Sequence, residues 1–372
     1  MQLIQAQSLE KSTKILFITH LAIGDFTYLQ NFFSAFSRAY PHLQIDIWID
    51  EVRRTNDPNK WEFLKKYSLY DWAENCSFFR KVYRQTYSPD LLQQTIVEAR
   101  EENYPLVVSL ATLRPHNYAR LAREVGPNAF TVGIRGKTRW YAPWDAAAYK
   151  QLDATFAPFK APKNGYHITD VYADWFQQLG GVSVTTENRL PFVHIPDEWT
   201  NYATRQLTEW GITSERLAQG DKIVFINAFA KTKKRCWPLK SVAELVIAMR
   251  KLPEWRQTHF VINAVPQELK NVKTIFNAYQ ISDTYVFSAS DNFFQLPAIL
   301  QRCNLIISVE TAVMHLANAV QVPVIALMRQ KNPEWVPIDH QRSTVVMTER
   351  RSEWVDAIPV EKIVDAVSKK TD

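Results

Sequence analysis

Glycine is the residue that this sequence lacks most. It occurs only nine times among 372 residues, far below the usual ~7%. The nine positions form neither G-x-G-x-x-G nor G-x-x-x-x-G-K-[S/T], which excludes a standard dinucleotide-binding fingerprint and a Walker P-loop. A phosphate bound to this chain would therefore have to be held by a helix N-terminus or by cationic side chains.

Cysteine and long apolar runs are scarce too. The three cysteines, Cys76, Cys236 and Cys303, are too widely spaced for a disulfide framework or a C-x-x-C metal site. We therefore expect reduced thiols and no metal site of the C-x-x-C type. No apolar run reaches the roughly 18 residues of a membrane-spanning helix, and the opening segment MQLIQAQSLEKSTK has no apolar signal core. These features predict a cytoplasmic protein, with peripheral contact at the inner membrane left open.

The charge of the chain is spread evenly. The net charge is +6, and residues 1–190 and 191–372 each carry 22 basic and 19 acidic residues. A nucleic-acid-binding protein would cluster its basic residues, so we expect no nucleic-acid partner. Hydrophobic residues make up 46% and charged residues 22% of the chain, which is typical of a folded globular protein. The length favours two domains.

Apolar strand-like runs alternate with helical patterns along the whole chain, as in parallel α/β sheets. The runs KILFIT, QIDIWI, LVVSL and FTVG lie in the first half, and KIVFIN, HFVIN and LIISV in the second. A loosely patterned stretch near 185–200 separates them. We predict two doubly wound Rossmann-like α/β domains that face a central cleft, over 1–190 and 191–350. A final helix over 351–372 could pack back toward the first domain.

Ligands of doubly wound folds bind outside the carboxyl ends of the strands. The first such segment follows KILFIT and contains Gly24 and Asp25. Gly24 permits a turn or a close ligand approach, and Asp25 at a helix start could act as a general base. Aspartate is also a favoured helix cap, and capping alone is the simpler interpretation.

The segment after LIISV indicates an anion site. Glu310 and Thr311 lie on the turn into a helix, where free backbone N–H groups attract phosphate. His315 follows Thr311 by one helical turn and shares its face. The loop after KIVFIN adds cations that could neutralise a diphosphate: Lys231, Lys233, Lys234 and Arg235. A capped helix and a solvated charged loop are the simpler alternatives.

Cations also follow the strands of the first domain: Arg53, Arg54, Arg114, Arg135, Lys137 and Arg139. Because the carboxyl ends of parallel strands meet at one edge of a sheet, these cations predict a site for an acidic ligand. Each of them taken singly is more simply a solvated surface residue.

Taken in order, these segments resemble glycosyltransferase family 9, the lipopolysaccharide heptosyltransferases. DNFFQLPAILQRCNLIISVETAVMHLANAVQVPVIALM is similar to the family's helix–strand–(D-T-G-x-x-H-L-A)–strand signature, and THLAIGDFTYLQNFFSAFSRAYP to its first strand–helix unit. KKRCWP resembles the family's K-x-W-P loop, and NPEWVP the segment after its last donor-domain strand. The ordered set spans both predicted domains.

The resemblance implies a GT-B fold and an inverting, metal-independent transfer without a cofactor. The implied donor is ADP-heptose, and the implied acceptor is the Kdo or heptose of the lipopolysaccharide inner core. The N-terminal domain would bind the acceptor and the C-terminal domain the donor. By position, Asp25 would be the general base. The implied donor-binding residues are Lys234, Arg235, Glu268, Glu310, Thr311, Ala312 and His315. The acceptor-binding candidates are Gly24, Arg53, Arg114, Arg135 and Lys137.

Three departures from the family pattern affect the donor pocket. The family's D-T-G is here Glu310-Thr311-Ala312, its phosphate-binding lysine is Arg235, and Met328-Arg329 stand where it usually has Gly-Pro. Ala312 lacks the freedom of a glycine, and arginine differs from lysine in geometry. Two alternatives therefore stay open: a transferase of the same fold with another nucleotide sugar or acidic glycan acceptor, and a non-catalytic carbohydrate-binding relative.

Overall fold

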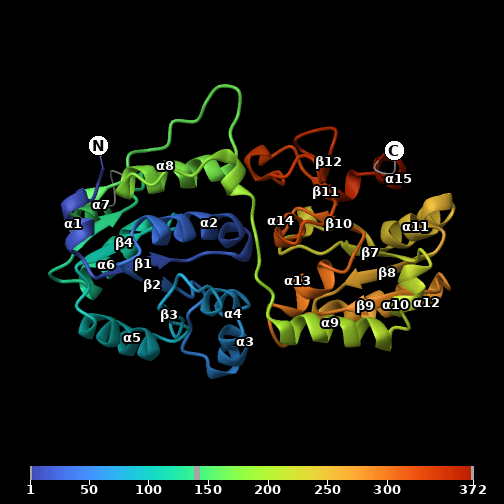
Figure 1. Cartoon of the computed structure of the whole chain (residues 1–372), viewed down its shortest axis with the longest axis horizontal. Coiled ribbons are helices and arrows are strands. Elements are labelled where there is room, and N and C mark those ends of the chain that lie inside the picture. The colour runs from blue at the N-terminus through green and yellow to red at the C-terminus, as the bar shows by residue number, and fades with distance from the viewer. Residues whose placement is uncertain (1, 138–142, 370–372) are drawn as a thin grey trace. The chain divides into compact units, whose positions relative to one another are not determined.

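The computed structural model describes residues 2–137 and 143–369, and the chain forms two compact units, Met1–Arg189 and Leu190–Asp372. Each unit is built on a parallel sheet of six strands with helices on both faces (Figure 1). Both units therefore have the doubly wound α/β architecture that the alternation of strands and helices predicted.

The first unit has the strand order β3-β2-β1-β4-β5-β6. Its strands are β1 (Lys14–Thr19), β2 (Gln44–Ile49), β3 (Lys81–Tyr83), β4 (Leu106–Ser109), β5 (Phe130–Gly133) and β6 (Ala154–Thr155). Its helices are α1 (Ala6–Lys11), α2 (Ile23–Ala39), α3 (Trp61–Lys65), α4 (Leu69–Glu74), α5 (Pro89–Glu101), α6 (Pro115–Val125), α7 (Pro143–Tyr149) and α8 (Ile168–Gly180).

The central strand β1 is apolar on both faces because helices cover both. Leu16 and Ile18 belong to the core that α5 and α6 close on one side. Phe17 points to the other face, where its ring lies 5.0 Å from Phe33 of α2 and 6.1 Å from Phe176 of α8. A strand buried in this way reads as a continuous apolar run, which explains the pattern of KILFIT.

The second unit has the strand order β12-β11-β10-β7-β8-β9. Its strands are β7 (Lys222–Asn227), β8 (Thr258–Asn263), β9 (Thr284–Phe287), β10 (Leu305–Val309), β11 (Val324–Met328) and β12 (Ser343–Met347). Its helices are α9 (Asp197–Glu209), α10 (Ser214–Ala218), α11 (Leu239–Arg250), α12 (Leu269–Ala278), α13 (Gln295–Leu300), α14 (Ala312–Ala319) and α15 (Val360–Ser368). The last helix, α15, packs against α11 and the strands β11 and β12 of its own unit.

The strand order reverses beside the first strand of each unit, between β1 and β4 and between β7 and β10. Loops that leave two such strands diverge to opposite sides of the sheet and open a crevice, the usual ligand position in this architecture. A ligand site is therefore expected at the residues that follow β1 and β4 in the first unit and β7 and β10 in the second.

Helix α2 begins earlier than its sequence pattern indicated. The sequence predicts a start near Phe26, whereas the helix begins at Ile23. Gly24 is therefore the second residue of a helix and does not form the turn expected before it. Among the described residues, no helix is both long enough and apolar enough to cross a membrane.

Candidate active site

Asp25 is the third residue of α2, directly beyond the carboxyl end of β1. Its Oδ2 accepts the backbone N–H of Ala22, and its Oδ1 accepts the hydroxyl of Tyr172 from α8, each at 3.2 Å. Ala22 precedes the helix and has no side-chain acceptor, so Asp25 satisfies the free N–H of the helix start. Both contacts are long, and each carboxylate oxygen keeps a lone pair for a further donor.

The surroundings of Asp25 favour a proton acceptor. Burial raises the pKa of Asp25 above its ordinary value, although the Ala22 N–H and the Tyr172 hydroxyl oppose the shift. Burial and the charge of Asp25 raise the pKa of Tyr172, so this hydroxyl stays protonated and can donate. A carboxylate whose pKa moves up toward neutrality is a better general base than an ordinary surface aspartate.

The predicted acceptor cations of the first unit fall into two groups. Arg53 is held by the buried Glu51 through two bonds of 2.7 Å, from Nε to Oε1 and from Nη2 to Oε2. Its charge is therefore already compensated. By contrast, Arg114, Arg135 and Lys137 are exposed, and none of them forms an ion pair with a residue that the structure describes. Arg139 lies outside the described residues.

Arg114 has a strained backbone. It follows β4 and precedes α6, with φ 50° and ψ 51° in the left-handed region. A non-glycine residue in this conformation costs energy, and such strain gathers at functional sites. Arg114 lies on the β4 side of the crevice beside β1, where it is available to a ligand.

In the second unit, Thr311 caps the helix that follows β10. Its Oγ1 accepts the Val313 N–H at 3.3 Å and the Asn227 amide at 2.9 Å. Asn263 in turn donates to the Asn227 side-chain oxygen at 2.9 Å. Asn227 and Asn263 were not predicted as site residues from the sequence, although each is the polar last residue of a strand with an apolar centre, which is the signal that could have found them.

Glu310 lies at the centre of a group of charged and polar residues that we name the Glu310 cluster: Glu310, Arg235, Arg329 and Asn332. The Glu310 side chain is only 4% exposed. Its Oε2 lies 3.3 Å from Nε of Arg329, and its Oε1 lies 3.3 Å from Nδ2 of Asn332 and 3.9 Å from Nη1 of Arg235. The cluster thus gathers residues that follow β7, β10 and β11, which are neighbouring strands.

The other predicted donor residues have separate surroundings. Lys234 lies over the ring of Trp354 at 5.6 Å. Glu268 directly precedes α12 and accepts the Asn271 amide at 3.0 Å. His315 is buried, with its ring 5.9 Å from that of Trp335. The structure therefore brings Arg235, Glu310 and Thr311 together, with Ala312 as the first residue of α14.

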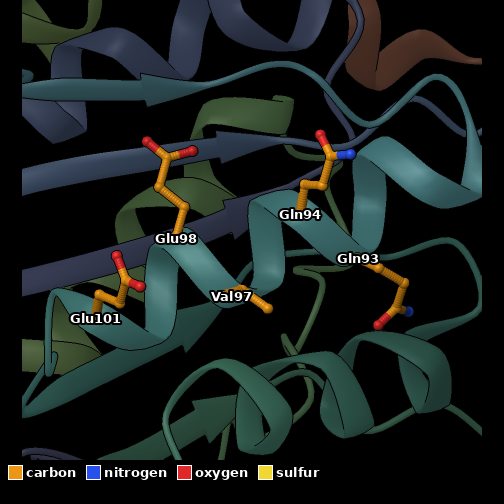
Figure 2. A pocket seen from close by; sticks show the side chains of 5 residues that line it. All are labelled: Gln93, Gln94, Val97, Glu98 and Glu101. Carbon is orange, nitrogen blue, oxygen red and sulfur yellow. The ribbon is translucent and has the colours of Figure 1, made fainter.

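A shallow hollow elsewhere on the first unit has different chemistry. It is lined by Gln93, Gln94, Val97, Glu98 and Glu101, all of them on the outer side of α5 (Figure 2). Glu98 pairs at 2.8 Å with Lys81, the first residue of β3, so this end of the hollow lies at the amino ends of the strands. Its glutamates would repel a phosphate, and it faces away from the crevice.

The chain is similar to known proteins both in sequence and in fold. The chain matches the family model of glycosyltransferase family 9 (heptosyltransferase) over residues 121–357. No curated protein sequence matches it. A family 9 glycosyltransferase from Veillonella parvula DSM 2008 has 18% identity and a TM-score of 0.73, with 98% of each chain covered.

Two structures from E. coli are also similar. The ADP-heptose lipopolysaccharide heptosyltransferase II has 15% identity and a TM-score of 0.68, and the heptosyltransferase WaaC with ADP has 13% identity and a TM-score of 0.64. In both, 96% of this chain and 98% of the other are covered. At these identities the likeness concerns the fold, which is the GT-B fold that the sequence predicted.

The family match spans well over half of the chain, from α6 to the segment before α15, and includes the whole Glu310 cluster. The match begins after Asp25. The role of Asp25 is therefore supported only by the geometry around it and by the resemblance of the sequence to the family. The chain is a glycosyltransferase, and it belongs to glycosyltransferase family 9, the heptosyltransferase family.

Proposed function

We propose that the chain is an inverting, metal-independent transferase that moves heptose from ADP-heptose to the Kdo or heptose of the lipopolysaccharide inner core. The single observation that carries the catalytic part is Asp25: a carboxylate beyond β1, at the crevice of the first sheet, with its pKa raised by burial. In a single displacement, Asp25 takes the proton of the acceptor hydroxyl while that oxygen attacks C1 of the donor sugar.

The leaving diphosphate needs positive charge, and the second unit supplies it. Arg235 and Arg329 follow β7 and β11, and the backbone N–H groups that begin α14 lie beside Thr311. Cations and a helix N-terminus stabilise the charge that develops on the departing phosphate. We therefore assign donor binding to the second unit, with Lys234, Glu268 and His315 at its margin.

Acceptor binding belongs in this proposal to the first unit. Arg114, Arg135 and Lys137 suit the carboxylate and phosphate groups of the lipopolysaccharide core, since none is paired with a described acid. Arg53 contributes less because Glu51 already compensates its charge.

Another nucleotide sugar is the second candidate donor, and the Glu310 cluster is the observation that favours it. Glu310, Ala312 and Arg329 replace the residues usual in the family at these positions, and Glu310 and Arg329 belong to this cluster. A non-catalytic relative is less favoured, because such a protein would not need a half-buried carboxylate at the crevice of the first sheet.

A nucleotide panel followed by a transfer assay tests the proposal. ADP, UDP, GDP and CMP are added in thermal unfolding experiments, since a ligand at about 100 times its Kd stabilises by about 2.7 kcal/mol. We expect ADP to give the largest shift and ADP-heptose to be consumed only with a Kdo-lipid acceptor. A shift with UDP or GDP alone would favour the second donor, and the absence of transfer from any donor would refute the catalytic assignment.

A further inference from the structure

The ion pairs of the Glu310 cluster are longer than most of the other arginine–carboxylate pairs among the described residues. Its contacts to Glu310 measure 3.3, 3.3 and 3.9 Å. Bonds between a guanidinium and a carboxylate are ordinarily about 2.7–2.9 Å. In the first unit, Arg53 meets Glu51 at 2.7 Å and Arg80 meets Glu102 at 2.8 Å. The Glu310 carboxylate is buried, yet none of its bonds is formed at full strength.

The charges of the cluster do not balance. Arg235 and Arg329 carry two positive charges, and Glu310 supplies one negative charge. Besides the Glu310 carboxylate, Arg235 contacts Oγ1 of Thr232 through Nε at 3.2 Å and the backbone oxygen of Glu310 through Nη1 at 3.5 Å. The two guanidinium groups have ten N–H donors between them, which is more than these acceptors can take. The surplus lies at the carboxyl ends of three neighbouring strands, beside the start of α14. The surplus of one positive charge suits an anion, and an anion with two negative charges would match both arginines once Glu310 is released from them.

We propose that Glu310 is an internal anion that competes with the diphosphate of the donor for Arg235 and Arg329, and that Arg329 is a diphosphate-binding residue. The inference rests on the proposed function for the identity of its ligand, a nucleoside diphosphate sugar. When the diphosphate arrives, the two arginines turn to its oxygens and the Glu310 carboxylate is released from them. Binding therefore exchanges one anion for another without leaving either arginine unpaired in a half-buried place.

A purely structural ion pair would behave differently. Removal of either partner of a buried pair leaves the other charge uncompensated, so both changes would lower stability and neither would improve the binding of an anion. Competition gives opposite signs: loss of Arg329 weakens anion binding, and loss of the Glu310 charge strengthens it. The sign of the Glu310 effect therefore separates the two interpretations.

Calorimetric titration with inorganic pyrophosphate at fixed ionic strength tests the proposal on the full chain. The variants are Arg329→Met, Glu310→Gln, the double variant, and Arg342→Met as the matched control. Arg342 precedes β12 and pairs with Asp339 at 2.9 Å. Its replacement therefore removes the same charge from the same unit, but at the amino ends of the strands and not at their carboxyl ends. Thermal unfolding establishes that each variant is folded.

We expect Arg329→Met to weaken pyrophosphate binding about tenfold to hundredfold, the range for a charge-assisted bond. Glu310→Gln should tighten it about tenfold, since a nearby like charge is removed. When Arg329 is already methionine, Glu310→Gln should tighten pyrophosphate binding less, because only Arg235 remains to be released from the carboxylate. Arg342→Met should bind as the wild type does. Titration with ADP should give the same order.

Equal pyrophosphate affinity in wild type, Arg329→Met and Glu310→Gln would overturn the proposal, and so would a wild-type protein that does not bind pyrophosphate. If Glu310→Gln does not fold, Glu310→Asp, which withdraws the carboxylate by one methylene, must still tighten binding. Pyrophosphate contains neither base nor sugar. Transfer by a protein whose variants bind pyrophosphate equally would thus refute only this inference, and the expected binding pattern without any transfer would refute only the proposed function.

Discussion

Replacement of Asp25 by asparagine is the most direct test of the catalytic assignment. The two side chains have nearly the same shape, and asparagine can still accept the Ala22 N–H and contact Tyr172, so the start of α2 should stay intact. What the variant loses is the ability to take a proton. Structure and chemistry are therefore separated by a single change.

The expected magnitude follows from the role. General-base catalysis contributes about 10²–10⁴-fold, so kcat should fall by that factor, or about 3–5 kcal/mol in activation free energy. The free energy of unfolding, by contrast, should not fall at pH 7. Because burial raises the folded pKa of Asp25, the stabilising contribution of this group is complete only below its unfolded pKa and is lost as the pH rises through the folded value. At pH 7 the asparagine variant should be at least as stable as the wild type, and this advantage should vanish in acid.

The assay measures release of the nucleoside diphosphate under saturating donor and acceptor, together with nucleotide affinity and thermal unfolding. Asp170 offers a matched control because it is also the third residue of a helix, and its Oδ2 accepts the N–H of His167 at 2.9 Å. It also pairs with Arg189. Asp170→Asn should therefore lose more stability than Asp25→Asn and yet keep normal turnover.

Normal turnover by Asp25→Asn would refute the reasoning, since it would leave Asp25 as a helix cap with no chemistry. A large loss of stability at pH 7 in that variant would refute the account of its buried charge. A weakened affinity for the nucleotide would contradict the assignment of the donor to the second unit.

Three further changes give distinct results. Tyr172→Phe removes a hydroxyl that lowers the pKa of Asp25, so the acid limb of the kcat/KM profile should move to higher pH and kcat should fall several-fold, as a pH–rate series would measure. Arg114→Gly relieves the left-handed backbone and should preserve or raise stability by about 0.5–1 kcal/mol in chemical denaturation, while the KM for the anionic acceptor rises. Hydrogen bonds from Lys14 and Arg80 lower the pKa of Glu102 to about 2, so its stabilising contribution is present above pH ~4.5 and lost as the pH falls through about 2. Glu102→Gln should therefore unfold more easily at pH 7 by about 2–3 kcal/mol, and should match the wild type below pH ~2.

The sequence determined the central strands by itself. β1, β2, β5, β7 and β10 have the bounds that their apolar runs predicted, because strands covered on both faces must be apolar throughout. The alternation of such runs with helical patterns also fixed the doubly wound class. The edge strands β3, β6 and β12 were not predicted, since they are short or half-exposed and depend on a neighbour for their pairing.

The start of α2 shows where local signals end. A helix start is usually marked by a capping side chain just before it, and Ala22 has none. The only half of such a cap that forms is the reverse bond, in which Asp25 of the first turn accepts the backbone N–H of Ala22. Asp25, which the sequence predicted as the catalytic base, therefore also supports a start of α2 earlier than the sequence predicted.

The sequence also predicted the central residues of each site, because a polar residue that directly follows an apolar strand can be recognised from the sequence. Tertiary structure alone decided what these residues meet. Tyr172 reaches Asp25 across 147 positions of the chain, and Asn227 reaches Thr311 across 84. Arg53 and Arg114 look alike in the sequence, and the fold pairs only the first with a buried carboxylate. Periodicity and end signals are local properties of a chain, whereas the strand order that gathers β7, β10 and β11 beneath Glu310 is a property of the folded sheet.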